Sequence, residues 1–290
     1  MVEQTAHIRS VAGSSPIAAI KKRCSAYGAS FFLFYGDYMK DYKNLALTIY
    51  KRKSFRVYSQ TKVDILENDT DLIRAFDIQP LIGDIKVKVK ILRKNEVKND
   101  RSDYCLAFYS EEKPFYLENI GFIGQQLELE LQSRGIGTCW WGMKKPKKNF
   151  KNADGLSSII TMTAGFPKTP DFRTSVNDFS RKPVEEIIVN NPTDIKSIKS
   201  DQLIETVRLA PSAVNLQPWL IEKINNKYNF YIRSPKGIIE KMINDMRHID
   251  IGIAMAHLFV QAKADGSNVS FSFEGTNIKQ GKFIASLIIS

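Results

Sequence analysis

The spacing of apolar positions along this chain predicts helices and strands in alternation. Between residues 42 and 50 the apolar side chains recur three or four positions apart, as on one face of a helix. Between residues 85 and 91 they alternate strictly with lysines, which is typical of a strand with one buried face. The apolar runs at 104–109 and 158–164 are hydrophobic enough for central strands.

Two helices are predicted in the middle of the chain. Apolar residues recur along one face over 117–131, and Gly135 follows where a left-handed cap favours glycine. Farther on, Ser200 can cap a helix that runs to Arg208. This helix must end near Ala210, because Pro211 disfavours the helical conformation of the residue that precedes it.

The last part of the chain is predicted to form a hairpin, a helix and two further strands. Strands at 218–224 and 228–232 flank an Asn-Asn-Lys sequence, which favours a tight turn. A helix is expected over 250–264, followed by strands near Val269 and Ile284.

Two of these helices share an internal spacing. The interval from Gly121 to Gly135 equals the interval from Gly252 to Gly266. An apolar strand follows in both cases. The equal spacing suggests two copies of a helix-then-strand unit, related by the constant offset that carries Gly121 to Gly252.

Residues 1–38 differ in composition from the rest. They are rich in Ala, Ser and Gly and carry more bases than acids, a composition compatible with an organellar targeting leader. We interpret them as an N-terminal extension, or as the result of a start assigned upstream of Met39.

Composition and charge narrow the class of protein without naming an activity. The chain has 290 residues, 43% hydrophobic and 25% charged, as in ordinary soluble globular proteins. Its 42 Lys and Arg exceed its 31 Asp and Glu, and the net charge of +11 favours an anionic partner. That anion could be nucleic acid, a lipid headgroup or a phosphorylated cofactor. The lysines of 85–91 and the basic run at 144–151 are expected to face solvent.

The cysteines indicate a reducing compartment. Cys24, Cys105 and Cys139 show no Cys-x-x-Cys spacing, and their odd number leaves one unpaired. We therefore expect a cytoplasmic protein. The apolar run at 31–35 is too short to cross a bilayer, so no membrane association is expected. No metal site is expected either, because the C-terminal histidines lack the spacing of helical zinc ligands.

The first segment with candidate binding chemistry is Arg52-Lys53-Ser54-Phe55-Arg56. It places three cations and a hydroxyl at the end of a predicted helix. Guanidinium groups offer paired donors to phosphate, and the serine adds a neutral donor. Taken alone, such a segment is typical of a basic surface patch.

In the second segment, 208–219, Pro211 ends one helix and Pro218 prevents another from starting. Ser212, Asn215 and Gln217 are therefore presented from a constrained loop that can donate and accept hydrogen bonds. A rigid, polar and irregular loop suits recognition better than packing.

Further segments add a flat apolar surface and more cations. Glycines within 135–142 allow a planar ring to approach the backbone, and Trp140-Trp141 supply apolar surface. Cys139, directly before the two tryptophans, is interpreted as a small buried thiol rather than a nucleophile. Farther on, an Ala-Gly-Phe-Pro sequence follows a strand, and Arg181-Lys182 adds two cations.

In combination these segments resemble the FMN-dependent nitroreductase family. Its members typically carry an Arg-Arg-Ser-x-Arg element, an Ala-Pro-Ser-x-x-Asn-x-Gln-Pro-Trp element and a Gly-rich element that ends in Trp-Leu-Gly. They close with Gly-Tyr-Pro and Arg-Lys-Pro-Leu-Glu-Glu-Val-Val elements. Counterparts of all of these lie within 39–266, and their joint presence is a strong signal.

The order of the elements departs from the family's usual one, because the Ala-Pro-Ser element follows Arg181-Lys182-Pro183. The sequence is therefore similar to the fused, single-chain nitroreductase group. The resemblance implies an α+β, nitroreductase-like fold of two diverged halves, 39–190 and 191–290, that form an intramolecular pseudo-dimer. The join lies near the candidate linker at 190–193. Such a chain would hold one complete flavin site, as a monomer or as a further homodimer.

The resemblance also implies roles for individual residues. The implied cofactor-binding residues are Arg52, Lys53, Ser54, Arg56, Cys139, Trp140, Trp141, Gly142, Arg181, Lys182, Pro211, Ser212, Ala213 and Asn215. Among them, Arg52, Ser54 and Arg181 would hold the FMN phosphate. Arg56 would lie toward the pyrimidine edge of the flavin, and the Gly142 amide would donate to flavin N5.

The function implied is an FMN-dependent NAD(P)H oxidoreductase. NADH or NADPH would reduce the flavin, and a small-molecule electron acceptor such as a nitroaromatic or quinone would reoxidise it. No side chain need be catalytic, because the flavin performs the hydride chemistry. One alternative is a protein that binds flavin or another nucleotide without turnover. A nucleic-acid binder is disfavoured, because no nucleic-acid module is recognised.

Overall fold

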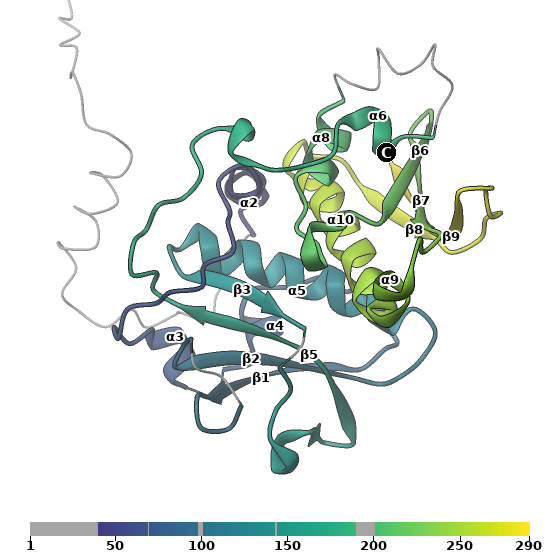
Figure 1. The fold of residues 1–290 in the computed structure, drawn as a ribbon. Helices are drawn as coiled ribbons and strands as arrows, with labels where there is room; N and C mark the ends of the chain where they lie inside the picture. The colour runs from purple at the N-terminus through teal and green to yellow at the C-terminus, as the bar shows by residue number, and fades with distance from the viewer. Residues whose placement is uncertain (1–39, 69, 98–100, 143, 190–200) are drawn as a thin grey trace, which may run out of the picture. The chain divides into compact units, whose positions relative to one another are not determined.

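The computed structural model describes residues 40–68, 70–97, 101–142, 144–189 and 201–290 (Figure 1). In this part of the chain one order of elements occurs twice: two strands, a long helix and two more strands. The first copy comprises β1 (Val87–Arg93), β2 (Tyr104–Ser110), α5 (Tyr116–Ser133), β3 (Gly137–Trp141) and β5 (Leu156–Gly165). The second copy comprises β6 (Trp219–Ile224), β7 (Lys227–Arg233), α10 (Asn244–Ala264), β8 (Val269–Ser272) and β9 (Gly281–Ile289).

Each copy forms its own antiparallel sheet. The strand orders among the described residues are β1-β2-β5-β3 and β6-β7-β9-β8, with β4 (Asn152–Ala153) paired to β5. The register between the second and the last strand of each sheet shifts once, after Phe108 in the first sheet and after Phe230 in the second. The shared order and the shared irregularity extend the repeat predicted from the glycine spacing to the whole of each sheet-and-helix unit.

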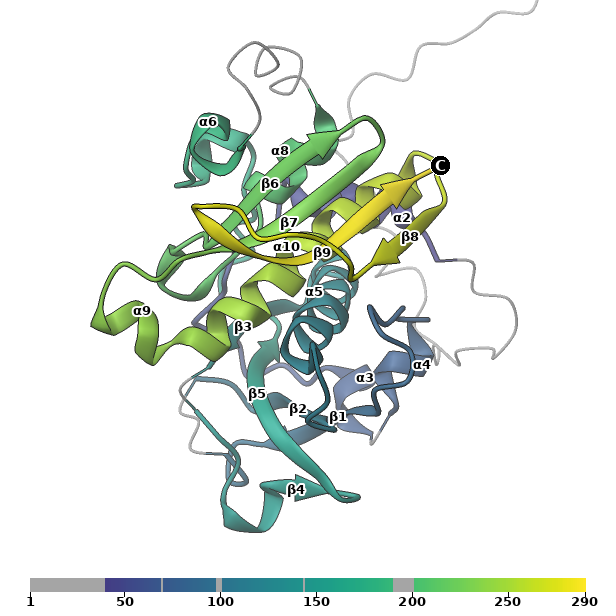
Figure 2. The same ribbon diagram turned by 90° about the vertical axis from the view of Figure 1, so that its right-hand side faces the viewer.

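The two long helices lie between the two sheets. α5 packs on the first sheet, α10 packs on the second, and the two helices pack on each other (Figures 1 and 2). One apolar core runs through these layers, and Ile120, Leu127, Ile251 and Leu258 are fully buried in it. The two copies therefore share a core rather than forming independent domains.

Two glycines allow α5 and α10 to approach closely. A Cβ atom at Gly121 would lie 2.0 Å from the carbonyl oxygen of Ile249, and one at Gly252 would lie 2.0 Å from that of Glu118. The contact is reciprocal, because each glycine meets the residue three positions before the other glycine. Reciprocal contacts of this kind are the mark of two elements related by a twofold axis.

The remaining elements are short. The short helices are α2 (Tyr42–Ile49), α3 (Asp64–Glu67), α4 (Leu72–Ala75), α6 (Val184–Ile187), α8 (Gln202–Arg208) and α9 (Ile238–Met242), and the 3₁₀ turns are η1 (Lys148–Phe150), η2 (Val176–Asp178) and η3 (Ala213–Asn215). Of these, α2 packs against both long helices.

The α+β class and the predicted helices and strands are confirmed, with differences at their ends. Gly135 and Gly266 adopt φ angles of +78° and +83°, as expected of glycine caps. The helix expected from residue 250 begins at Asn244, because its first turns are polar and give no apolar periodicity. The expected cap Ser200 and the linker at 190–193 lie outside the described residues. The side chain of Asp201 caps α8 instead, by accepting a hydrogen bond from the amide of Leu203.

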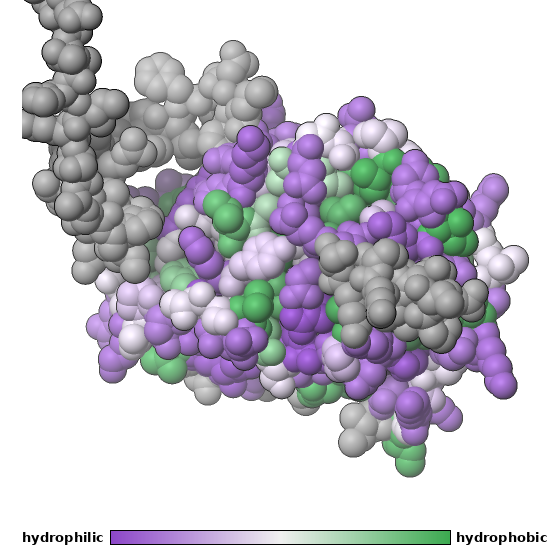
Figure 3. Space-filling view, turned by 90° about the horizontal axis from the view of Figure 1, so that it is seen from above, coloured by the Kyte–Doolittle hydropathy of each residue, from purple (hydrophilic) through white to green (hydrophobic). Residues whose placement is uncertain are grey.

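The face of the molecule seen in Figure 3 is largely hydrophilic, with apolar side chains in small separate patches. The basic run at 144–151 contains the turn η1 instead of being a loop throughout, and Lys147 and Lys148 are exposed. In the strand at 85–91, Lys86 is exposed, whereas Lys88 and Lys90 are half-buried.

Within the described residues, no helix combines the length and the apolar character that crossing a membrane requires.

Candidate functional site

A cavity of about 150 Å³ opens where the two copies meet. Its walls come from the segment after α2, the end of β3, β5, the loop before β6, and α10. The lining residues are Ser54, Arg56, Cys139, Trp140, Gly142, Ile160, Pro211, Ser212, Ala213, Val214, Met246, Ile249, Asp250 and Ile253. Segments that are far apart in the sequence therefore share one site.

The basic segment after α2 is fixed against β3. Ser54 forms a parallel bridge with Thr138, and the amide of Phe55 donates to the Thr138 carbonyl at 2.9 Å. The Phe55 ring fills the space above Gly137, where an added Cβ would lie 2.8 Å from ring atoms. This pairing leaves Ser54 and Arg56 on the cavity wall.

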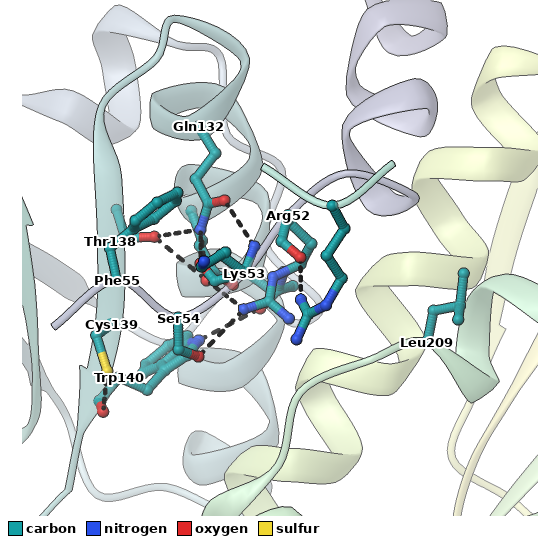
Figure 4. A network of polar contacts seen from close by, with 12 residues as sticks. Arg52, Lys53, Ser54, Phe55, Gln132, Thr138, Cys139, Trp140 and Leu209 are labelled. Atoms are coloured by element: carbon teal, nitrogen blue, oxygen red, sulfur yellow. Dashed lines mark hydrogen bonds and ion pairs between the residues drawn. The ribbon is translucent and has the colours of Figure 1, made fainter. Parts of the chain in front are cut away.

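Arg52, from the same segment, points into the protein (Figure 4). Only 1% of Arg52 is exposed, and its Nη2 contacts the carboxylate of Glu128 on α5 at 3.1 Å. Glu128 is itself fully buried and also accepts hydrogen bonds from Gln132 and Thr138. Arg52 is therefore part of a buried polar network that joins the basic segment to α5 and β3.

Arg52 also belongs to a cluster of three arginines with Arg173 and Arg181. Arg181 donates to the Oδ1 of Asn215 at 2.9 Å and to the carbonyl of Leu209 at 3.3 Å. Arg173 donates to the carbonyl of Arg52. Burial, followed by the positive charges of Arg52 and Arg173, lowers the pKa of Arg181 to about 9. Burial makes the largest contribution to this shift, and the neighbouring guanidinium groups, which stay protonated in proteins, add to it.

The cluster retains unused hydrogen-bond donors. Among the described residues, the Nε atoms of Arg52 and Arg181 are buried and have no hydrogen-bond partner. Buried donors without partners are costly. An anion beside the cluster would satisfy them and would offset the mutual repulsion of the cations.

The loop between Pro211 and Pro218 is tightly constrained. The amide of Gln217 donates to the Oγ of Ser212 at 2.9 Å, and the Oε1 of Gln217 accepts from the amide of Lys182 at 2.8 Å. Val214 and Asn215 adopt positive φ angles of 46° and 57°. A β-branched residue rarely adopts this conformation, so Val214 marks local backbone strain. It is also 79% exposed, at the rim of the cavity.

Asp250 of α10 anchors this loop. Both of its carboxylate oxygens accept from the amide of Ala213 at 3.1 Å, and the side chain lines the cavity. Burial raises the pKa of this carboxyl well above its usual range, with the Ala213 amide and Arg247 acting in the opposite direction. Sequence reasoning missed Asp250 and its neighbours Met246, Ile249 and Ile253. The available signal was a single carboxyl within the long apolar stretch of the second glycine-containing helix.

The two tryptophans of β3 have different environments. The ring of Trp140 stacks on Phe108 at 5.5 Å, and its Nε1 donates to the Oε1 of Gln125 at 3.3 Å. Trp141 lies outside the cavity lining, with the guanidinium of Arg101 4.4 Å from its ring centroid. Burial raises the pKa of the Cys139 thiol, so this cysteine is not poised as a thiolate.

The structure thus brings part of the sequence-predicted set to one cavity. Those that line it are Ser54, Arg56, Cys139, Trp140, Gly142, Pro211, Ser212 and Ala213. Those that lie outside its lining are Arg52, Lys53, Trp141, Arg181, Lys182 and Asn215. Asn215 is joined to the first half through Arg181, and Lys182 Nζ donates to the carbonyl of Leu216 at 2.9 Å.

Comparison with known proteins identifies the family. The family model described as "Putative TM nitroreductase" matches residues 44–262. The chain belongs to this family. As a nitroreductase-family member it shares its fold with a "putative nitroreductase" from Thermotoga maritima, with 20% sequence identity and a TM-score of 0.55. That match covers 90% of this chain and 99% of the other.

Other similar structures are smaller proteins. A nitroreductase described as FMN-dependent, from Clostridium difficile R20291, is 13% identical, with a TM-score of 0.34, and covers 53% of this chain and 99% of its own. A "putative NADH dehydrogenase/NAD(P)H nitroreductase" from Parabacteroides distasonis is 18% identical, with a TM-score of 0.39, and covers 51% of this chain and 98% of its own. Comparison with curated proteins gives no match.

Proposed function

We propose that this nitroreductase-family chain is an FMN-dependent NAD(P)H oxidoreductase that reduces small electrophilic acceptors such as nitroaromatics or quinones. The observation that carries the proposal is the cavity shared by the Ser54–Arg56 segment and the loop after Pro211, beside the arginine cluster. A phosphorylated ring cofactor needs both features next to each other: cations for the phosphate and a narrow apolar slot for the ring.

The arginine cluster fits the phosphate. The unpartnered Nε atoms of Arg52 and Arg181 supply donors, and the Ser54 hydroxyl, 3.4 Å from Arg52 Nη2, supplies another. Arg173 extends the cluster beyond the residues that the sequence implied. Asn215 orients Arg181, so the second half acts on the phosphate side through an arginine of the first half.

The cavity fits a planar ring at its mouth. Its volume of about 150 Å³ is below the roughly 300–1,000 Å³ of ordinary ligand sites. Arg56 and Val214, which also line the cavity, would therefore contribute to holding a flavin ring there. Gly142 and Pro211 offer close backbone and flat apolar contacts there, and Trp140 supports the wall from the core.

When bound, FMN supplies reversible two-electron hydride chemistry. The chain's residues supply placement and charge. The cationic cluster would hold the phosphate, Arg56 would favour negative charge on the ring, and the apolar side chains of Ile249 and Ile253 would exclude water. NADH or NADPH and then the acceptor would use the same cavity in turn.

We further propose that the two copies form a pseudo-dimer with one cofactor site. Gly142 lies against Met246 at the cavity, where an added Cβ would be 2.7 Å from the Met246 Cε. The offset in residue number that relates Gly121 to Gly252 also relates Gly142 to Phe273 and Phe115 to Met246. The ring centroids of Phe273 and Phe115 lie 5.1 Å apart. Aromatic side chains thus fill the equivalent place in the other copy, which supports one FMN per chain.

The proposal is tested by FMN affinity and turnover in Arg181→Ala, with Arg74→Ala as the control. Arg74 is an exposed arginine of α4 outside the cluster, so the control removes the same charge. Arg181→Ala is expected to weaken FMN binding roughly 10- to 100-fold, because charge-assisted hydrogen bonds to phosphate are lost. Replacing Arg52 is a poorer test, because it leaves Glu128 buried without its partner, at a cost of about 3–5 kcal/mol.

The outcomes separate the candidate functions. A purified chain that binds one FMN and oxidises NADH or NADPH when a quinone is present supports the oxidoreductase. Tight FMN binding with no such oxidation identifies a flavin-binding protein without turnover. Equal FMN affinities in Arg181→Ala and the wild type contradict the phosphate assignment.

A further inference from the structure

We propose that Asp250 carries a proton in the cavity and delivers it to the electron acceptor during reduction. This inference rests on the proposed oxidoreductase function. Asp250 lies on α10, is 3% exposed and lines the same cavity as Ser54 and Cys139. Among the described residues that line the cavity, it is the one carboxylic acid.

The reaction requires such a group. Reduction of a quinone to a hydroquinone takes up one hydride and one proton. A reduced flavin cofactor would supply the hydride, and NADH or NADPH would supply its two electrons. The proton comes from Asp250: its O–H bond breaks, a new O–H bond forms on the acceptor, and the carboxylate takes a proton back from water.

The other polar residues of the cavity do not suit this role. Burial raises the pKa of the Cys139 thiol above its usual value, so it holds its proton at neutral pH. A guanidinium group such as that of Arg56 does not act as a proton donor in proteins. The hydroxyls of Ser54 and Ser212 are far too weakly acidic. Asp250 alone among them has a carboxyl group, whose pKa burial raises, so it can hold a proton and release it.

The charges around Asp250 support both protonation states. Burial favours the neutral acid. The Ala213 amide, at 3.1 Å, and the attraction of Arg247 on the same helix stabilise the carboxylate after release. Arg247 is buried and lies 3.9 Å from Glu240 of α9, which offsets part of its charge.

The elements packed against α10 contribute further charges. On the α5 side, the Oε1 of Glu118 lies 2.5 Å from the Nδ1 of His248. Arg56 also lines the cavity. Burial therefore favours the neutral form of the Asp250 carboxyl, while the Ala213 amide and Arg247 limit the rise in its pKa.

The test uses Asp250→Asn in the FMN-loaded protein, with Asp245→Asn as a matched control. Asn keeps an oxygen that can accept from the Ala213 amide but cannot transfer a proton. Asp245 is an exposed acid of the same helix that does not line the cavity. FMN affinity, reduction of the flavin by NADH and reoxidation by a para-benzoquinone are measured separately by rapid mixing.

Asp250→Asn is expected to slow reoxidation roughly 100-fold, the usual worth of a general acid, with FMN affinity and reduction by NADH little changed. Wild-type reoxidation should slow as pH rises through the Asp250 pKa, and this dependence should be absent in Asp250→Asn. Asp245→Asn should behave as the wild type.

An independent readout is the infrared band of a protonated carboxyl group, recorded without turnover. The wild type should show a band at neutral pH that disappears in Asp250→Asn and stays in Asp245→Asn. Wild-type protein without that band, or Asp250→Asn with normal reoxidation, overturns the assignment of Asp250. Failure of the wild type to bind FMN or to be reduced by NADH would instead contradict the proposed function.

Discussion

Gly121 and Gly252 occupy equivalent places on α5 and α10, and each lies directly against the backbone of the other's helix. The close approach of these helices places α10 where it can form one wall of the cavity, while β3, which follows α5, forms another. The close contact of the two helices therefore helps to position two walls of the site as well as the core.

Replacing Gly121 with Ala is expected to destabilise the protein strongly. The new Cβ would lie 2.0 Å from a backbone carbonyl oxygen that no rotamer change can move. Overpacking typically costs about 1–3 kcal/mol, and a clash with backbone belongs at or above the upper end. Chemical denaturation measures the loss. Gly83→Ala is the control, because an added Cβ at Gly83 meets nothing within 4 Å. Equal unfolding free energies for the two variants would refute the helix contact.

Val214→Gly is expected to stabilise the protein, although it removes a side chain. The positive φ of Val214 costs a β-branched residue about 1–3 kcal/mol, and glycine adopts the same angle freely. The extra flexibility of glycine in the unfolded chain returns about 0.5–1 kcal/mol of this gain. The net expectation is a rise of about 1 kcal/mol in the free energy of unfolding.

Val57→Gly provides the comparison for Val214→Gly. Val57 is also exposed, at 63%, and is not among the described residues with positive φ. Replacing Val57 with glycine should lower the free energy of unfolding slightly, only because glycine has more conformational entropy in the unfolded chain. If both glycine variants lose stability, the strain assigned to the loop after Pro211 is absent.

His257 predicts a specific loss of stability in acid. Its ring connects both halves: Nδ1 lies 2.8 Å from the carbonyl of Thr206 on α8, and Nε2 lies 3.1 Å from Gln125 Nε2 on α5. The carbonyl can only accept, so Nδ1 carries the proton and Nε2 accepts from Gln125, whose Oε1 in turn accepts from Trp140. Burial lowers the pKa of His257 to about 3 from its usual 6.5.

The direction follows from proton binding. Between pH 6.5 and about 3 the unfolded chain binds a proton at His257 and the folded chain does not. The free energy of unfolding therefore falls as pH decreases through this window, by up to about 1.4 kcal/mol per pH unit from this residue. In His257→Gln the slope between pH 6 and 4 should be smaller than in the wild type, whatever its stability at neutral pH. Parallel slopes would contradict the buried neutral histidine.

Sequence patterns predicted the elements and the segments that meet at the site, but not the directions of their side chains. Glycine caps and apolar periodicity depend on local chemistry, so the ends of α5 and the halves of the repeat could be inferred. Trp140 and Trp141 could not be told apart, because neighbours on a strand face opposite sides and the register with β5 is a long-range property. Arg52 appeared to be a free cation because Glu128, its buried partner, lies far along the sequence on a helix.

The space beside Gly142 is expected to determine how well the proposed cofactor fits. An alanine Cβ there would lie 2.7 Å from the Cε of Met246, whose flexible end would have to turn. Because Met246 lines the cavity, the displaced side chain would take up space that the proposed flavin ring needs. Gly142→Ala is therefore expected to weaken FMN binding about tenfold, equivalent to about 1.4 kcal/mol. The measurement is fluorescence titration with FMN.

The control for Gly142→Ala is the double variant that carries both Gly142→Ala and Met246→Ala. If Gly142 acts by leaving room, removing the Met246 side chain should restore FMN affinity in the double variant, so the two substitutions are strongly non-additive. If Gly142 acts instead through its backbone amide, Gly142→Ala alone should bind FMN normally, since alanine keeps that amide. A double variant as weak as Gly142→Ala would show that the added methyl group acts on the cofactor without Met246.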